Sequence, residues 1–521
     1  MEQKTRSSFL LDCLPRRAAS TLRANRLPFL AALVWGMLAY GFAFTNKLVN
    51  HDEVSQLFGK GATVSSGRWG LGALDAIFPN YSMPWIYGIV TIVLIAVGIC
   101  LILRMFQIEN KVLQVLLSGC IMVFPSVIGV FGYMFTSSSY GLSYLLCVLA
   151  VWLLTRKKWL ALPLAVGCMV ASLSIYQSYV SIAASLLVLL LIRELLTGAE
   201  PAAVLKKGIG YVLFLVLSLA LYYGATQVIL KWKGISFNDY ASDSLTLSFS
   251  GILNGIRLAY LNFCRFFYWA HHQLMPTSAS RYLHFYLFCG ILVVLLLLAA
   301  SQKRQRLARY ALLAVLVALL PLAINCMYLI TAESSIHTLV LYSFTSLYVL
   351  AAMVLELALP CISPRKLPEL LRRLALELMP VLLAAIVVIN VYVANESYLN
   401  MHLRYENAYA FYTTLTANLQ QMPEFTEGTR LAVIGSWESP DYYTERFAFT
   451  DGLIGVKGFL PSDYSYSYFL EYYLGFPVEC VTEEEAEAIR QTEAFQNMPT
   501  YPYYGSMALI DDVIVVKLSE N

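Results

Sequence analysis

Residues 27–44 of this chain read LPFLAALVWGMLAYGFAF, and the more polar stretch that follows contains His51-Asp52-Glu53. An apolar run of this length is typical of a helix that crosses the hydrocarbon core of a bilayer, which takes about 17 to 25 residues. The rest of the chain has the same character, since 59% of its 521 residues are hydrophobic and 13% are charged, with a mean hydropathy of +0.64. The sequence therefore predicts an α-helical polytopic membrane protein with two adjacent carboxylates just beyond its first helix.

Further apolar runs bring the predicted number of transmembrane helices to eleven. They are 27–45, 85–103, 112–135, 140–155, 159–174, 177–192, 208–230, 285–301, 310–331, 339–360 and 381–399. The fifth and sixth divide one apolar stretch, 159–192, which is too long for a single span at a rise of about 1.5 Å per residue. Only Ser174-Ile175-Tyr176-Gln177-Ser178 interrupts it, so we predict a hairpin with Tyr176-Gln177 at its turn.

The basic residues predict the orientation of the helices. Most of the 36 Lys and Arg residues fall in alternate connecting segments, in clusters such as Arg16-Arg17, Lys303-Arg304-Gln305-Arg306 and Arg365-Lys366. Such clusters remain on the cytoplasmic side. We therefore expect a multi-pass protein of a bacterial cytoplasmic membrane with its N-terminus inside and its first helix retained. The loops 46–84 and 231–284 and the C-terminal tail then lie outside.

The tail, residues 400–521, is expected to form a separate domain beside a transmembrane module of residues 1–399. It contains 18 acidic and six basic residues, so it is acidic and soluble. Its pattern predicts a small α/β fold in which residues 400–422 extend the last transmembrane helix outward. The expected elements are a strand at Leu431–Gly435, an amphipathic helix at Asp463–Tyr473, a helix opened by the capping box Thr482-x-x-Glu485, and a hairpin of Met507–Ile510 with Val513–Leu518.

The loop 46–84 contains the residues best suited to catalysis. A carboxylate of Asp52 or Glu53 could take the proton from an attacking hydroxyl, although an acidic pair can also simply cap a helix in a solvated loop. Gly67-Arg68-Trp69-Gly70 follows, and an arginine can bind phosphate through its forked donors. Trp69 could stack on a sugar ring, but a tryptophan near a membrane surface is more often an interfacial anchor.

Two other regions are candidates for substrate binding. Gln177 could hydrogen-bond sugar hydroxyls beside Tyr176, or both residues could simply end two helices. In the loop 231–284, apolar residues recur at helical spacing (Ile252, Ile256 and Tyr260) beside a polar stripe that contains Arg257 and Arg265. This pattern predicts an interfacial helix, whose arginines could bind the phosphate of a lipid or interact with headgroups.

We expect no metal ion, no cofactor and no nucleic-acid partner. His271, His272 and His284 have no carboxylate close by in sequence, and adjacent histidines rarely bind one ion together. Glu356 lies near the cytoplasmic end of its helix, whereas a proton-coupled transporter is expected to carry ionisable residues near the bilayer midplane.

The order of these motifs resembles that of a known family. A carboxylate-bearing first external loop, many helices and a C-terminal external domain are similar to the plan of GT-C glycosyltransferases, and more narrowly to Gtr-type bacterial glucosyltransferases of O-antigen and envelope glycans. The matching pieces are His51-Asp52-Glu53, Gly67-Arg68-Trp69, Ser174-Ile175-Tyr176-Gln177-Ser178 and Met498-Pro499-x-Tyr501-Pro502-x-x-Gly505-Ser506.

The resemblance implies transfer of glucose from a polyprenyl-phosphate donor to an envelope glycan, at the outer face of the membrane. It implies that Asp52, either alone or together with Glu53, acts at the catalytic centre. We expect His51, Arg68, Trp69, Tyr176, Gln177, Arg257 and Arg265 to contact the substrates. This chain has Asp-Glu where Asp-Asp is frequent, so which carboxylate is the base stays open. The alternatives are a transporter or flippase of a lipid-linked sugar, and a polymerase-like envelope assembly protein.

Overall fold

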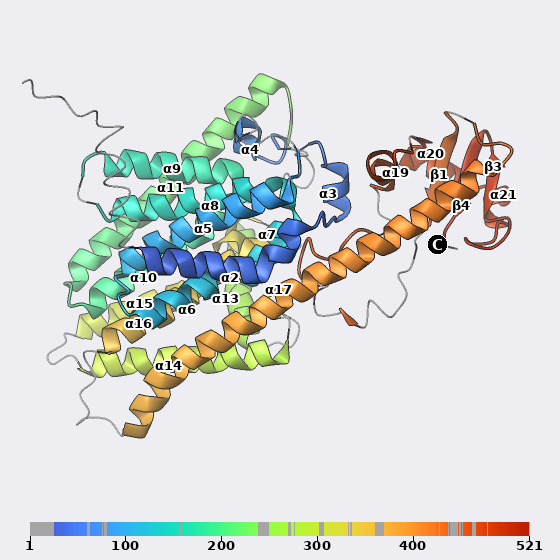
Figure 1. Ribbon diagram of the computed structural model, residues 1–521. Coiled ribbons are helices and arrows are strands. Elements are labelled where there is room, and N and C mark those ends of the chain that lie inside the picture. The colour runs from blue at the N-terminus through green and yellow to red at the C-terminus, as the bar shows by residue number, and fades with distance from the viewer. Residues whose placement is uncertain are drawn as a thin grey trace, which may run out of the picture.

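The computed structural model consists of a bundle of helices and a smaller domain, joined by one long helix (Figure 1). It describes residues 25–519 apart from short gaps. These are 60–62, 75–76, 78–80, 157, 238–248, 269–271, 276, 302–306, 332, 334–335, 360–368, 427, 436, 438–445, 448–449, 451, 461–464 and 477. The basic clusters before residue 25, at 303–306 and at 365–366 therefore lie outside the described residues.

The N-terminal half of the bundle consists of apolar helices joined by short segments. They are α2 (Arg26–Thr45), α5 (Pro84–Phe106), α6 (Lys111–Met122), α7 (Pro125–Gly132), α8 (Met134–Leu154), α9 (Ala161–Ile175), η3 (Gln177–Tyr179), α10 (Val180–Leu196) and α11 (Pro201–Lys233). Two short helices, α3 (His51–Ser55) and α4 (Trp69–Ala73), lie in the first loop. The chain breaks after Ile175, where Tyr176 is extended, so the predicted break of the long apolar stretch is confirmed.

The second half completes the bundle and leaves it through α17. Its elements are α13 (Phe249–Tyr268), α14 (Ser278–Ser301), α15 (Leu307–Ile324), η4 (Cys326–Leu329), η6 (Thr338–Thr345), α16 (Ser346–Ala358) and α17 (Glu369–Gln420). Within the described residues, nine helices are long and apolar enough to cross a membrane, and a tenth span results if the bent pair α6–α7 is counted. The fifth predicted helix, 159–174, corresponds to α9, which has only 15 residues, so the count of eleven stays a prediction.

The bend between α6 and α7 shows how the bundle satisfies polar backbone groups in its interior. Pro125 has no N–H, so the carbonyl of Ile121 loses its normal helical partner. The hydroxyl of Tyr342 donates to that carbonyl at 3.0 Å, and the hydroxyl of Tyr40 donates to the carbonyl of Met122 at 2.8 Å. Both tyrosines are buried. The 44° bend is therefore stabilised by side chains from α2 and η6.

The C-terminal domain contains a four-stranded sheet of order β2-β1-β4-β3. In it β1 (Arg430–Ile434) is parallel to β2 (Glu479–Cys480) and β4 (Val513–Lys517), and β3 (Met507–Ile510) is antiparallel to β4. The predicted first strand, terminal hairpin and capping box of Thr482 with Glu485 are confirmed. The flanking helices are α19 (Tyr466–Leu474), α20 (Glu483–Arg490) and α21 (Glu493–Gln496).

Two further predictions concern the boundaries of helices. The predicted helix Asp463–Tyr473 is observed as α19, and its first predicted residues lie outside the described part of the chain. Helix α17 runs without interruption past residue 400 to Gln420, which confirms that the last helix continues beyond its apolar part; its outward direction stays a prediction. The division into domains 1–399 and 400–521 stays a prediction, because this helix belongs to both parts.

The C-terminal domain contacts the first loop directly. Val49, two residues before α3, and Val54, within α3, are fully buried in one apolar cluster with residues of α17 and α19 such as Tyr412 and Phe469. The rings of Phe58 and Tyr472 meet edge to face at 5.1 Å. Helix α3 is therefore held between the bundle and the C-terminal domain, as Figure 1 shows.

Candidate functional site

A cavity of about 330 Å³ lies where α3, the first loop and the start of η6 meet. Its lining combines carboxylate, cationic and aromatic side chains from segments far apart in the sequence. The lining residues are Asp52, Gln56, Thr63, Arg68, Leu71, Tyr133, Phe135, Thr136, Tyr140, Tyr176, His337, Leu339 and Ile454. Three of the residues predicted from sequence, Asp52, Arg68 and Tyr176, thus meet in one place.

Helix α3 owes its position to Asn50. The side-chain oxygen of Asn50 accepts a hydrogen bond from the Glu53 N–H at 2.8 Å and caps the helix. Its amide nitrogen donates to the carbonyls of Gly132, at the end of α7, and Gly455, in the C-terminal domain, at 2.8 and 2.9 Å. One buried side chain therefore fixes the start of α3 against both parts of the molecule.

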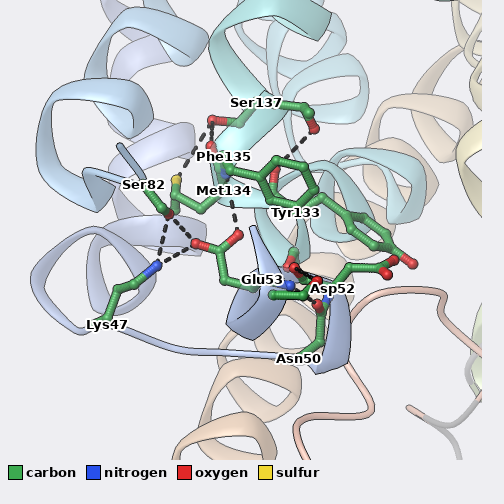
Figure 2. A network of polar contacts seen from close by, with 12 residues as sticks. Lys47, Asn50, Asp52, Glu53, Ser82, Tyr133, Met134, Phe135 and Ser137 are labelled. Carbon is green, nitrogen blue, oxygen red and sulfur yellow. Dashed lines mark hydrogen bonds and ion pairs between the residues drawn. The ribbon is translucent and has the colours of Figure 1, made fainter. Parts of the chain in front are cut away.

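The two carboxylates of α3 point in different directions (Figure 2). The side chain of Asp52 is 38% exposed, lines the cavity and lies 3.7 Å from the His51 ring. The side chain of Glu53 is fully buried, where an unpaired charge would be costly. Its neighbours are Lys47, which forms an ion pair with it, the hydroxyl of Ser82, and the Phe135 N–H, which donates at 3.2 Å.

The contact with Phe135 gives Glu53 a structural role. Phe135 belongs to the first turn of α8, whose unpaired N–H groups favour a negative charge. Lys47 also donates to Ser82 at 2.7 Å, so Lys47, Ser82 and Glu53 all contact one another in a closed network (Figure 2). Glu53 holds α3 against the bundle, while Asp52 faces the cavity.

The turn that presents Arg68 is fixed by residues of η3 and α11. Gly67 has φ +74°, a conformation that suits glycine. Its carbonyl accepts from the Tyr222 hydroxyl at 3.0 Å. Gln177 donates to the carbonyl of Ser66 at 3.0 Å and to the Tyr222 hydroxyl at 2.9 Å. Gln177 therefore supports the turn before Arg68, and it is not among the described residues that line the cavity.

The residues after Arg68 anchor the other side of the turn. The indole N–H of Trp69 donates to Thr226 of α11 at 3.1 Å. A Cβ atom on Gly70 would lie 2.2 Å from the Ser174 hydroxyl oxygen, so α4 and the end of α9 can approach this closely only with glycine there. The motifs 67–70 and 174–178, separate in the sequence, thus form one structural unit.

Arg68 contacts two tyrosines on the cavity wall. Its guanidinium donates to the Tyr140 hydroxyl at 3.3 Å and lies 5.6 Å from the centre of the Tyr176 ring, within range of a cation–π interaction. The rings of Tyr140 and Tyr176 stack with their centres 4.5 Å apart. This wall offers a cation and aromatic faces, groups that suit a phosphate and a sugar ring.

His337, which we did not predict, lies on the same lining. It is the residue before η6, and its Nδ1 atom is buried without a hydrogen-bond partner among the described residues. Burial, with the nearby charge of Arg68, lowers the pKa of His337 from 6.5 to about 4. Its imidazole is therefore neutral at pH 7. The one signal for it in the sequence is a histidine just before a predicted apolar run.

The backbone near His337 also contacts the C-terminal domain. The side-chain oxygen of Thr338 accepts from the Ile454 N–H at 3.1 Å, and Ile454 itself lines the cavity. The adjacent Gly455 is the residue that accepts from Asn50. The segment 454–455 therefore connects the start of η6 with the helix that carries Asp52.

The predicted arginines of the second loop lie on α13, none of whose described residues lines the cavity. Arg257 is exposed, and Arg265 forms an ion pair of 3.6 Å with Glu333. The buried face of α13 contains Ala259, Phe263 and Phe266, whereas Ile252, expected on the apolar face, is 37% exposed. The roles predicted for Arg257 and Arg265 stay predictions.

The histidines of this region have partners within the protein. His272 contacts Asn262 at 3.1 Å and accepts from the Leu274 N–H at 3.2 Å. His284 contacts the Ser280 carbonyl and the Tyr348 hydroxyl, both at 2.6 Å. His271 lies outside the described residues. Within the described part of the chain, no group of three His, Cys, Asp or Glu residues could hold a metal ion.

Comparison with known protein families places most of the helical bundle in one of them. The model of the family described as Glucosyl transferase GtrII matches residues 41–355, more than half of the chain, and this range includes Asp52, Arg68, Tyr176 and His337. No curated protein and no solved structure matches the chain.

Proposed function

The chain belongs to the Glucosyl transferase GtrII family and is a glycosyltransferase with membrane-spanning helices, and from this premise we propose its donor, mechanism and orientation. It moves a hexose, which the family name indicates is glucose, from a polyprenyl-phosphate donor to a hydroxyl of an envelope glycan. The reaction takes place in the cavity of Asp52, Arg68 and His337, at the outer face of a bacterial cytoplasmic membrane. The C-terminal domain lies on the same side.

The observation that supports this proposal is the placement of Asp52 and Arg68 on one cavity. The acceptor oxygen attacks C1 of the hexose while Asp52 takes its proton. The bond from C1 to the phosphate oxygen breaks, and its electron pair leaves with the polyprenyl phosphate. Arg68 stabilises the negative charge that develops on this leaving group. A glycosidic bond replaces the sugar–phosphate bond, so atoms and charges balance.

Glu53 is the positioning residue in this proposal. Its carboxylate is buried against Lys47, Ser82 and the start of α8, and it is absent from the described residues that line the cavity. Asp52 is therefore the better candidate for the base. Trp69 hydrogen-bonds to α11, and Gln177 hydrogen-bonds to the turn before Arg68. In this proposal both residues support the position of Arg68.

The stereochemistry of the product tests the mechanism. A single displacement inverts the anomeric centre, so a polyprenyl-phospho-β-hexose must give an α-linked product. The protein in lipid nanodiscs is supplied with polyprenyl-phosphate-glucose of defined anomeric configuration and a crude envelope glycan, and the new linkage is assigned by NMR. Retention of configuration would overturn direct displacement. Movement of the lipid-linked sugar across the bilayer without transfer would favour a flippase.

A further inference from the structure

His337 is the one imidazole among the described residues that line the cavity. Its Nδ1 atom is buried and has no hydrogen-bond partner in the described part of the chain. Buried polar atoms in folded proteins almost always have a partner, so a ring nitrogen of this kind beside a cavity is suited to a hydrogen bond with a bound molecule. The ring is held at the start of η6, where the buried residue Thr338 connects the chain to Ile454 at 3.1 Å.

The charged groups that line the cavity with His337 are Asp52 and Arg68. The remaining polar neighbours include the side chains of Tyr133, Tyr140 and Tyr176. Arg68 is close enough to oppose a positive charge on the His337 ring. The cavity wall therefore places Arg68 and His337, which can both carry positive charge, close together. An anion bound there would attract both.

We propose that His337 and Arg68 together bind the phosphate of the lipid-linked donor, with His337 donating a hydrogen bond to a phosphate oxygen. This inference rests on the proposed function, because it specifies how the donor of that reaction is recognised. Arginine supplies the forked donors that match phosphate geometry. An imidazole adds a third donor from another segment of the chain.

The same contact serves the leaving group. When the bond from C1 breaks, the phosphate gains a negative charge on the oxygen that was bonded to the sugar. A bound phosphate favours the protonated ring, which reverses the effect that Arg68 has on His337 in the absence of an anion. The hydrogen bond from His337 therefore strengthens as the reaction proceeds, so its loss lowers kcat as well as donor affinity.

Binding of a short-chain polyprenyl phosphate without a sugar tests this proposal. Affinity is measured for the unaltered protein and for His337→Ala, His337→Gln and Arg68→Ala in the same detergent. We expect His337→Ala to weaken binding about tenfold, the loss typical of a charge-assisted hydrogen bond. Binding of the matching polyprenol, which has no phosphate, stays unchanged. His402→Ala is the matched control, since His402 lies on α17 beside Glu406.

The pH profile separates a phosphate contact from a purely structural role. The ratio of the affinities of the unaltered protein and His337→Gln cancels the ionisation of the phosphate itself. This ratio is expected to fall about threefold or more between pH 5.5 and 8, as the bound ring loses its proton. Thermal unfolding of each variant verifies that the folded fraction is the same.

The outcomes distinguish the inference from the function on which it rests. If the unaltered protein binds the phosphate probe and His337→Ala binds it within about twofold as well, the role of His337 is overturned and the donor class stands. A constant affinity ratio across the pH range overturns it in the same way. If the unaltered protein binds no polyprenyl phosphate, the proposed donor is wrong and the inference falls with it.

Discussion

The first loop and α13 present their arginines in opposite ways. Arg68 follows a glycine turn that Gln177 and Tyr222 hold from behind, and its guanidinium lies on the cavity wall. Arg257 is exposed on a regular helix, and Arg265 pairs with Glu333. A cation that must recognise a phosphate needs a fixed backbone and neighbours that orient it. Positive charge on one helical face supplies neither.

Removing the two arginines gives the largest expected difference between these regions. Arg68→Ala should lower kcat/KM for the lipid-linked donor about 100-fold or more, because it deletes a charge-assisted contact to the leaving phosphate. Arg257→Ala should change it by about twofold or less, as expected for an exposed charge. The measurement is the initial rate of hexose transfer at subsaturating donor. Equal losses in both variants would indicate that the phosphate binds between the first loop and α13. The two regions would then not differ in phosphate recognition.

A smaller effect is expected from the glycine that lets α4 reach α9. In Gly70→Ala the new Cβ would lie 2.2 Å from the Ser174 hydroxyl oxygen and 2.9 Å from the Ser174 carbonyl oxygen. Overpacking of this kind costs about 1–3 kcal/mol, and it displaces the turn that carries Arg68. We expect about a tenfold loss of transfer and a lower unfolding temperature.

Gly210→Ala is the matched control for that substitution. Gly210 lies in α11, and nothing lies within 4 Å of a Cβ built there. Alanine in an exposed helix is favourable by about 0.5–1 kcal/mol relative to glycine, so this variant should unfold at the same or a higher temperature. Full activity in Gly70→Ala would show that the close contact with Ser174 does not position Arg68.

The contrast between the regions also explains what could be predicted from the sequence. The apolar runs, the break at Tyr176 and the hairpin of β3 and β4 follow from local patterns, since chain length, periodicity and turn residues determine them. The motif containing Arg68 was recognisable because its glycines and aromatic residue are close together in sequence. The direction in which each α3 carboxylate points could not be predicted, because it depends on Lys47 and Ser82 and on a C-terminal domain several hundred residues away.

His337, too, could not be identified as a site residue from the sequence. It has no neighbouring motif, and it reaches the cavity only because η6 begins beside the first loop. Tyr140 reads as an ordinary residue of a transmembrane helix, and its contact with Arg68 links segments that no local pattern connects. Residues contributed one at a time by distant helices can be identified only in the folded chain.

The smallest expected effect is on stability. The pKa of His337 is about 4 in the folded protein and close to 6.5 in an unfolded chain. The unfolded state therefore binds more protons between these values, so stability is complete above about pH 6.5 and falls as the pH drops toward 4. Relative to His337→Gln, the unaltered protein should lose about 1–3 kcal/mol over this window.

Thermal unfolding of both proteins in detergent, from pH 7.5 to pH 4.5, measures this difference. His272 is the internal reference, since burial, with the charges of Arg265 and His284, lowers its pKa to about 4 as well, and it is present in both proteins. Parallel curves for the two proteins would show that the His337 ring is not buried as a neutral group.

The assignment of Asp52 as the base and Glu53 as its support is tested most directly by single-turnover transfer, with enzyme in excess over the lipid-linked donor. Asp52→Asn should bind the donor normally and transfer its hexose about 10²- to 10⁴-fold more slowly, the range expected for loss of a general base. Glu53→Gln should reduce the folded fraction, while each folded molecule keeps a rate within about tenfold of the unaltered protein. A rate for Asp52→Asn within about threefold of the unaltered protein would contradict the account.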